Sequence, residues 1–180
     1  MIKKYSTTLF IVQAGVIAAT YVVLTWVASL LGIANYAIQI RLSEALTILP
    51  LFTPAAIPGL FLGCIIANLS TGCHILDVLF GSIATLIGAF GTYFIGRIFQ
   101  KHENRTTMSL NIERILGAIP PIMANVIVIP PILAFVYHLE GSIPFFLLTV
   151  GIGEIISCGE LGFLLHAALY PHRQFFFRNE

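Results

Sequence analysis

Residues 45–76 read ALTILPLFTPAAIPGLFLGCIIANLSTGCHIL and contain no Asp, Glu, Lys or Arg. This stretch decides the number of helices, because it is long for one membrane crossing of about 20 apolar residues and short for two crossings with a loop. Three prolines interrupt it, and a proline inside a helix removes a backbone donor and kinks or breaks the helix. We therefore interpret the stretch as two short helices, near residues 43–53 and 57–69.

The composition of the whole chain is equally apolar. Of its 180 residues 58% are hydrophobic and 9% are charged, whereas a soluble domain carries about 25% charged residues. This excludes a soluble globular domain, a disordered chain and a nucleic-acid-binding protein. Further apolar stretches predict four more helices, near residues 9–33, 77–98, 115–137 and 143–169. We therefore expect one domain, residues 1–180, that is an all-α membrane protein with a bundle of six transmembrane helices.

The basic residues predict the orientation of the bundle, because cytoplasmic loops of membrane proteins carry an excess of Lys and Arg. Residues 5–40 carry no charge, far more than the ~7–15-residue core of a secretory signal, so they are interpreted as containing the first membrane helix. Six crossings with both termini in the cytoplasm place only Arg41 outside, and five crossings fit the rule slightly less well. The basic residues then inside are Lys3, Lys4, Arg97, Lys101, Arg105, Arg114, Arg173 and Arg178.

Polar residues on the outer side of this topology mark a candidate binding site. Asn125 and Glu154 lie about a dozen residues from the outer ends of their helices, or roughly 18 Å at 1.5 Å per residue. A charge at that depth costs at least about 2.5–3.5 kcal/mol, so such residues normally face a partner or a water-filled cavity. Glu160 falls on another face of the helix and is left out. The remaining candidates, at the outer helix ends, are Gln39, Arg41, Glu44, Asn68 and Asp77.

Structural roles remain open for several of these residues. Asp77 is placed to interact with the positive end of its helix dipole. Arg41 and Glu44 are three residues apart and are placed to pair on one helix face. Asn125 is equally suited to hydrogen bonding between helices. Glu154 has no basic residue in its own helix, which favours a functional role for this carboxylate.

The sequence offers little for catalysis or for a metal ion. The best metal-like cluster is Cys73, His74 and Asp77, which is short of ligands, and no HExxH pair occurs. The three cysteines are too few and too irregular for a zinc pattern, and we interpret them as packing residues. We therefore expect no enzyme activity, no cofactor and no metal site.

The first helix carries small residues at a four-residue spacing. Ala14 and Ala18 are four residues apart, as are Gly15 and Ala19. Small residues at this spacing let another helix approach closely. The approaching helix belongs either to the same protein or to a partner, and the spacing alone does not distinguish the two.

Two long segments of the chain resemble a known family. They are QIRLSEALTILPLFTPAAIPGLFLGCIIANL (residues 39–69) and LDVLFGSIATLIGAFGTY (residues 76–93), and the likeness extends to AATYVVLT, PPIMANVIV and VGIGEI elsewhere in the chain. These segments are similar to the QueT family, the queuosine-precursor-binding subunits of energy-coupling factor (ECF) transporters. The resemblance therefore covers most of the chain.

The resemblance implies a function and a set of partners. Members of this class are six-helix proteins of the bacterial cell membrane with both termini in the cytoplasm. They lack an ATPase of their own. They transport their substrate across the membrane together with a transmembrane coupling protein and two cytoplasmic ATPases. Their first helix carries an Ala-xxx-Ala docking strip, which Ala14 and Ala18 match.

The implied substrate has a chemistry that the candidate residues suit. A queuosine precursor is a flat deazapurine that resembles guanine, and one form carries a cationic aminomethyl arm. Carboxylates accept hydrogen bonds from the ring N–H and amine donors and pair with the ammonium group. The acceptors are Glu44, Asp77 and Glu154, and the donors for the ring carbonyl are Arg41, Gln39, Asn68 and Asn125.

Two other functions remain open at this point. The same architecture serves other micronutrients, such as cobalamin or a related corrinoid, although a large corrinoid needs a wide pocket with few ionic anchors. An independent proton-coupled carrier would use a membrane carboxylate such as Glu154 as its relay. The chain shows no evident inverted repeat, which disfavours the carrier.

Overall fold

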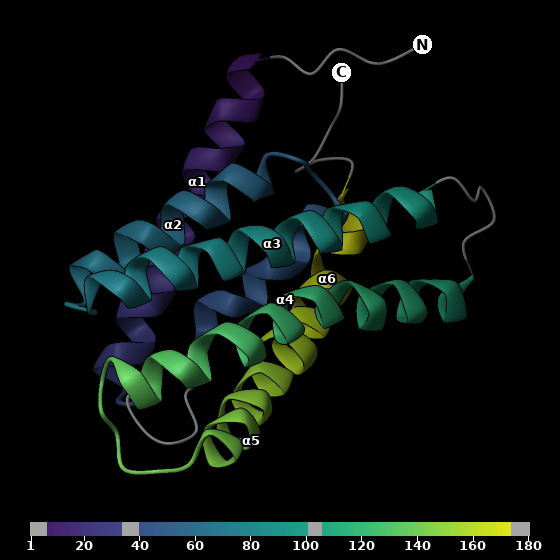
Figure 1. Ribbon diagram of the computed structural model, residues 1–180. Coiled ribbons are helices and arrows are strands. Elements are labelled where there is room, and N and C mark those ends of the chain that lie inside the picture. The colour runs from purple at the N-terminus through teal and green to yellow at the C-terminus, as the bar shows by residue number, and fades with distance from the viewer. Residues whose placement is uncertain (1–6, 34–39, 101–105, 174–180) are drawn as a thin grey trace.

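The computed structural model describes residues 7–33, 40–100 and 106–173, and this part of the chain is helical with short connections and no strand (Figure 1). Four stretches are long and apolar enough to cross a membrane, by length and composition: α1, α3, α4 and the continuous run Ile143–His172. The elements are α1 (Thr7–Leu30), η1 (Leu42–Leu51), α2 (Ala56–Ser70), α3 (Ile75–Gln100), α4 (Thr107–Phe135), α5 (Ile143–Glu154), η2 (Ile155–Leu161), α6 (Gly162–Leu169) and η3 (Tyr170–His172).

The all-helical prediction is confirmed, and the observed bounds refine it. The apolar stretch with three prolines does form two short helices, but the first of them, η1, is a 3-10 helix. Helix α4 begins at Thr107 rather than near residue 115, because Thr106 caps it by accepting a hydrogen bond from the Ser109 N–H. The ends of α3 and α4 are therefore closer in sequence than those of the predicted helices, residues 77–98 and 115–137. The last predicted helix is observed as α5, η2 and α6, with η2 in π-helical geometry.

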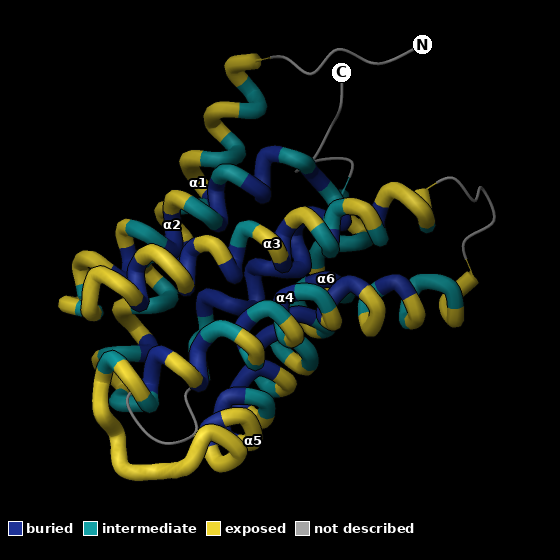
Figure 2. Tube along the Cα trace, viewed as in Figure 1, coloured by how far each residue is buried: buried dark blue, intermediate teal, exposed yellow. Residues whose placement is uncertain are grey.

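Helix η1 lies inside the bundle rather than on its surface. Every residue from Ser43 to Leu51 is buried, and Figure 2 shows this segment in dark blue between the outer helices. It packs against α1, α3, α6 and η2. At about 2.0 Å per residue a 3-10 helix of this length spans roughly 20 Å. Its ten residues therefore place side chains deep inside the bundle, and the helix is tighter than an α-helix would be.

Helices α3 and α4 approach each other through glycines that face prolines. A Cβ on Gly88 would lie 2.6 Å from Cα of Pro121, and a Cβ on Gly91 would lie 2.5 Å from Cβ of Pro120. Since Pro121 has no N–H, the carbonyl of Gly117 loses its usual helical donor. The Thr92 hydroxyl donates to that carbonyl at 2.7 Å. Pairing across the seam thus replaces one of the hydrogen bonds that the prolines of α4 remove.

Helices α1 and α2 pack through small residues on both sides. A Cβ on Gly59 would lie 2.7 Å from the carbonyl oxygen of Ala14, and a Cβ on Gly63 would lie 3.1 Å from Cα of Ala18. The small residues of α1 therefore make close contact within this chain. Gly15, by contrast, is exposed, and a Cβ built on it would have no neighbour within 4 Å.

The outside of the bundle is apolar and its inside holds many polar groups. Large hydrophobic side chains are exposed along every long helix, for example Leu30, Phe94, Ile127 and Leu148. Several carboxylate, amide and hydroxyl side chains are buried instead. This distribution suits a protein whose outer surface faces lipid.

Candidate functional site

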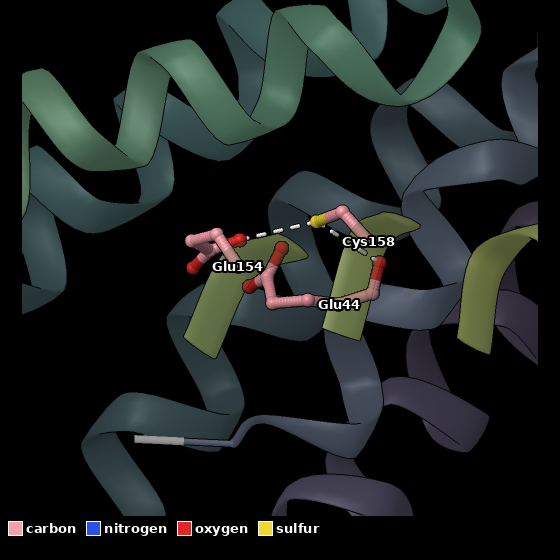
Figure 3. Close-up of side chains that lie close together, drawn as sticks. All are labelled: Glu44, Glu154 and Cys158. Carbon is pink, nitrogen blue, oxygen red and sulfur yellow. Dashed lines mark hydrogen bonds between the residues drawn. The ribbon is translucent and has the colours of Figure 1, made fainter. Parts of the chain in front are cut away.

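Two buried carboxyl groups and a thiol meet where η1 crosses the end of α5 and the start of η2. One ligand atom each from Glu44, Glu154 and Cys158 lies within 4.8 Å of the other two. Figure 3 shows the Glu44 carboxyl group turned toward Glu154, with Cys158 beside both. The thiol donates to Glu154 Oε2 at 3.1 Å and lies 3.6 Å from the backbone carbonyl oxygen of Glu44. We call these three residues the carboxyl cluster.

Other side chains surround the carboxyl cluster. The Tyr21 hydroxyl of α1 donates to Glu44 Oε1 at 2.5 Å. The side chain of Asn125, from α4, lies beside both carboxyl groups. The second oxygen of Glu44, Oε2, is buried and has no hydrogen-bond partner among the described residues. The cluster thus lies on η1, α5 and η2 with α1 and α4 beside it, and Glu44 Oε2 is an acceptor that no described residue uses.

The start of η1 is held against η2 by two polar contacts. The Arg41 N–H donates to the Ser157 hydroxyl at 3.1 Å. The Thr47 hydroxyl donates to the Glu44 carbonyl oxygen at 2.6 Å and lies 3.4 Å from the Cys158 sulfur. A π-helical segment is rare and often occurs at functional sites. Here it places Ser157 and Cys158 side by side against η1.

A second group of candidate residues surrounds a small polar cavity next to the carboxyl cluster. The cavity has a volume of about 90 Å³ and is lined by Thr25, Ala28, Ser29, Arg41, Asn68, Thr71 and Cys73. Because a water molecule occupies about 30 Å³ of liquid, a cavity of this size holds only a few waters. A bicyclic base would enter only if the surrounding side chains moved apart.

Asp77 belongs to the same polar region. Its Oδ2 accepts a hydrogen bond from the Tyr137 hydroxyl at 3.0 Å, and its Oδ1 is buried without a partner among the described residues. A Cβ on Gly81 would lie 3.5 Å from both Asp77 Oδ1 and Asn68 Nδ2, so these two side chains are neighbours. Burial raises the pKa of the Tyr137 phenol above its usual value, and Asp77 adds to the shift. The phenol therefore remains a donor at neutral pH.

Arg41 connects the two groups electrostatically. Its guanidinium interacts with Asp77 and with Glu44. Among the described residues, however, no basic side chain forms an ion pair with Glu44 or Glu154. The region thus combines three carboxyl groups with one nearby cation.

The structure brings together six of the seven predicted site residues. Glu44, Asn125 and Glu154 meet at the carboxyl cluster, while Arg41, Asn68 and Asp77 lie at and around the small cavity. The seventh, Gln39, lies outside the described residues. That these residues bind a ligand stays a prediction. Ala14 and Ala18 are half-buried against α2, and a docking role for them likewise stays a prediction.

Sequence reasoning missed three residues of this region. The sequence predicts a packing role for Cys158, although its position four residues after Glu154 on a helix is a usable signal. Tyr21 and Tyr137 gave no signal, because an isolated tyrosine in an apolar helix or a loop is common. The sequence predicts no metal site, and Cys73, His74 and Asp77 are its best metal-like cluster; among the described residues, the group whose ligand atoms lie close enough to hold a metal ion is instead the carboxyl cluster.

Comparison with known proteins identifies relatives of the chain. A family model described as QueT transporter matches residues 11–171. The queuosine precursor transporter QueT of Lactococcus lactis subsp. cremoris is 36% identical over 84 residues, which cover 47% of this chain and 49% of that protein. The chain thus aligns with about half the length of this curated relative. No solved structure matches the chain.

Proposed function

The chain belongs to the QueT transporter family, and from that premise we propose that it is the substrate-specificity subunit of an ECF-type importer for a queuosine precursor. The observation that carries the proposal is the buried polar region inside an otherwise apolar bundle. Burying three carboxyl groups in such a bundle is costly, and two of them, Glu44 and Asp77, retain an oxygen that no described residue hydrogen-bonds. A ligand rich in N–H donors would satisfy these acceptors.

The proposed ligand fits the residue types around the site. A deazaguanine presents adjacent ring N–H and amine donors, which a carboxylate binds with two parallel hydrogen bonds. Glu44, Asp77 and Glu154 supply the acceptors. Its ring carbonyl needs a donor, and Gln39, Arg41, Asn68 and Asn125 supply donors.

The proposed topology has six crossings, with both termini in the cytoplasm of a bacterial cell and one domain over residues 1–180. Its support is the excess of basic residues on one side and the division of residues 45–76 into η1 and α2. Labelling of an introduced Thr71→Cys from outside the cell tests this arrangement. Reaction with a membrane-impermeant maleimide is expected, and full protection would contradict six crossings.

The proposed partners are a transmembrane coupling protein and two cytoplasmic ATPases. The candidate contact surface on this chain is α1, where Ala14 and Ala18 lie half-buried and Gly15 and Ala19 are exposed. Ala14 and Ala18 have their closest contacts with α2. The exposed small residues beside them leave room for a second helix to approach.

Ligand identity provides the decisive test of the function. We expect mass spectrometry of the ligand that copurifies with the full-length protein to identify a 7-deazapurine, and equilibrium binding to show affinity for 7-deazaguanines but not for cobalamin. Uptake should require the coupling protein and ATPases. Binding of cobalamin would show that the substrate is a corrinoid rather than a queuosine precursor. Uptake into liposomes by this chain alone would indicate an independent carrier.

A further inference from the structure

The carboxyl cluster has an imbalance of hydrogen-bond acceptors over donors. Glu44 and Glu154 are 1% and 6% exposed, and together they present four carboxylate oxygens when ionised. Tyr21 and Cys158 each supply one donor, and the side chain of Asn125 lies beside both carboxyl groups as a further donor. No basic side chain among the described residues pairs with either carboxyl group. These donors are fewer than the carboxylate oxygens can accept, and Arg41 interacts with Glu44 without forming an ion pair within the described part of the chain.

The unused acceptor is directed into the cluster. Glu44 Oε2 is buried without a hydrogen-bond partner in the described part of the chain, and Figure 3 shows the Glu44 carboxyl group facing Glu154. An unsatisfied buried acceptor costs about 1–3 kcal/mol, and more when charged. A ligand atom that carries donors would remove this cost on binding.

We propose that Glu44 and Glu154 together bind a protonated amine, so that the site selects 7-deazaguanines with a cationic aminomethyl arm over the neutral 7-cyano base. This inference rests on the proposed function and names the chemical form of its substrate. An alkylammonium has a pKa near that of lysine, about 10.4, and is charged at neutral pH. A nitrile has no donor, and its nitrogen would face carboxylate oxygens.

The spacing of the two carboxyl groups suits one ammonium nitrogen. Charge-assisted N–H···O bonds are about 2.7–2.9 Å long, so a nitrogen that bonds to two oxygens bridges a gap of up to roughly 5.6 Å. The cluster atoms lie within 4.8 Å of one another. An ammonium group has three donors, of which the two carboxyl groups accept two.

The experiment compares three ligands on the purified full-length protein by equilibrium dialysis: 7-aminomethyl-7-deazaguanine, 7-cyano-7-deazaguanine and 7-deazaguanine. We expect the aminomethyl compound to bind about 10- to 100-fold more tightly than the other two, in line with charge-assisted hydrogen bonds. Glu44→Gln and Glu154→Gln should each reduce this advantage, because only the aminomethyl compound carries the positive charge that the lost carboxylate would pair with. Glu160→Gln, in an exposed carboxylate of the same helical run, should retain the full advantage.

The outcomes separate this inference from the proposed function. Equal or tighter binding of the cyano compound would overturn the amine assignment and leave the proposed function standing. Absence of binding by all three compounds would refute both. Stoichiometric Zn²⁺ binding that depends on Cys158, without an amine preference, would make the cluster a metal site and overturn the inference. If a Gln variant fails to fold, the ligand preference of the unmodified protein still decides between these outcomes.

Discussion

The seam between α3 and α4 and the carboxyl cluster bury polar groups in opposite ways. At the seam, Pro121 deprives the Gly117 carbonyl of its helical donor, and Thr92 replaces that donor at 2.7 Å. At the cluster, Glu44 retains an oxygen without a partner among the described residues. Both places lie inside the bundle, and only the seam is satisfied by the chain itself. The difference separates polar groups that hold the fold together from polar groups that are available to a ligand.

The largest effect is expected from filling the seam with a side chain. Gly88→Leu would place a Cβ 2.6 Å from the Pro121 backbone, which cannot move without bending α4. We expect a loss of about 3 kcal/mol or more in stability, seen as a large fall in the melting temperature in detergent. Gly15→Leu, at an exposed site with no neighbour within 4 Å, is the matched control and should melt as the unmodified protein does.

The next largest effect is expected from neutralising the cluster. Glu154→Gln keeps the shape of the side chain but removes its charge, and the lost charge-assisted hydrogen bonds should weaken binding of the aminomethyl ligand by about 1.5–3 kcal/mol. Equilibrium dialysis measures the loss, and the melting temperature of the empty protein should change little. A large fall in that melting temperature would show that Glu154 stabilises the fold. The carboxyl cluster would then resemble the seam, where polar groups hold the fold together.

A smaller effect is expected from removing the donor at the seam. Thr92→Val keeps the shape but leaves the Gly117 carbonyl unsatisfied, at a cost of about 1–2 kcal/mol. The melting temperature should fall while ligand affinity stays the same. Thr20→Val is the control, because the Thr20 hydroxyl is exposed and bonds to the Val16 carbonyl of its own helix. Reduced ligand affinity in Thr92→Val would mean that the seam and the site are coupled.

The smallest effect is expected from Cys158→Ser. The serine hydroxyl retains a donor toward Glu154 Oε2, which the thiol reaches at 3.1 Å. We expect a change in ligand affinity below about 1 kcal/mol, measured by the same dialysis assay. Cys158→Ala removes the donor, so it should change ligand affinity more than Cys158→Ser does. Identical affinities for the two variants would show that the thiol only fills space.

The helices could be predicted because charges and prolines divide the apolar sequence. The prolines between residues 45 and 76 correctly indicated two short helices, and the similarity to the QueT family is confirmed. The sequence did not indicate that η1 is a 3-10 helix buried along nearly its whole length, because that depends on the helices around it. The pattern of apolar residues also did not predict that α4 begins at Thr107. This start depends on one side-chain cap, in which Thr106 accepts a hydrogen bond from the Ser109 N–H.

The candidate site was partly predictable for a similar reason. A carboxylate such as Glu154 is conspicuous in an apolar helix, so its selection needed only the sequence. That Glu44 and Glu154 converge from segments more than a hundred residues apart depends on tertiary packing. Tyr21 completes the arrangement, and nothing in its sequence neighbourhood distinguishes it from other aromatic residues in membrane helices.

The π-helical geometry of Ile155–Leu161 has a consequence for chain length. Each of its hydrogen-bonded rings spans one residue more than an α-helical ring. A deletion of one residue between Glu154 and Gly162 would let the segment close as an ordinary α-helix and keep the flanking helices in phase. Because residues four apart share a face of an α-helix, a deletion after Cys158 would leave the thiol on the same face as Glu154. The four-residue spacing, rather than the extra residue of the π-helical segment, therefore keeps the thiol beside this carboxyl group.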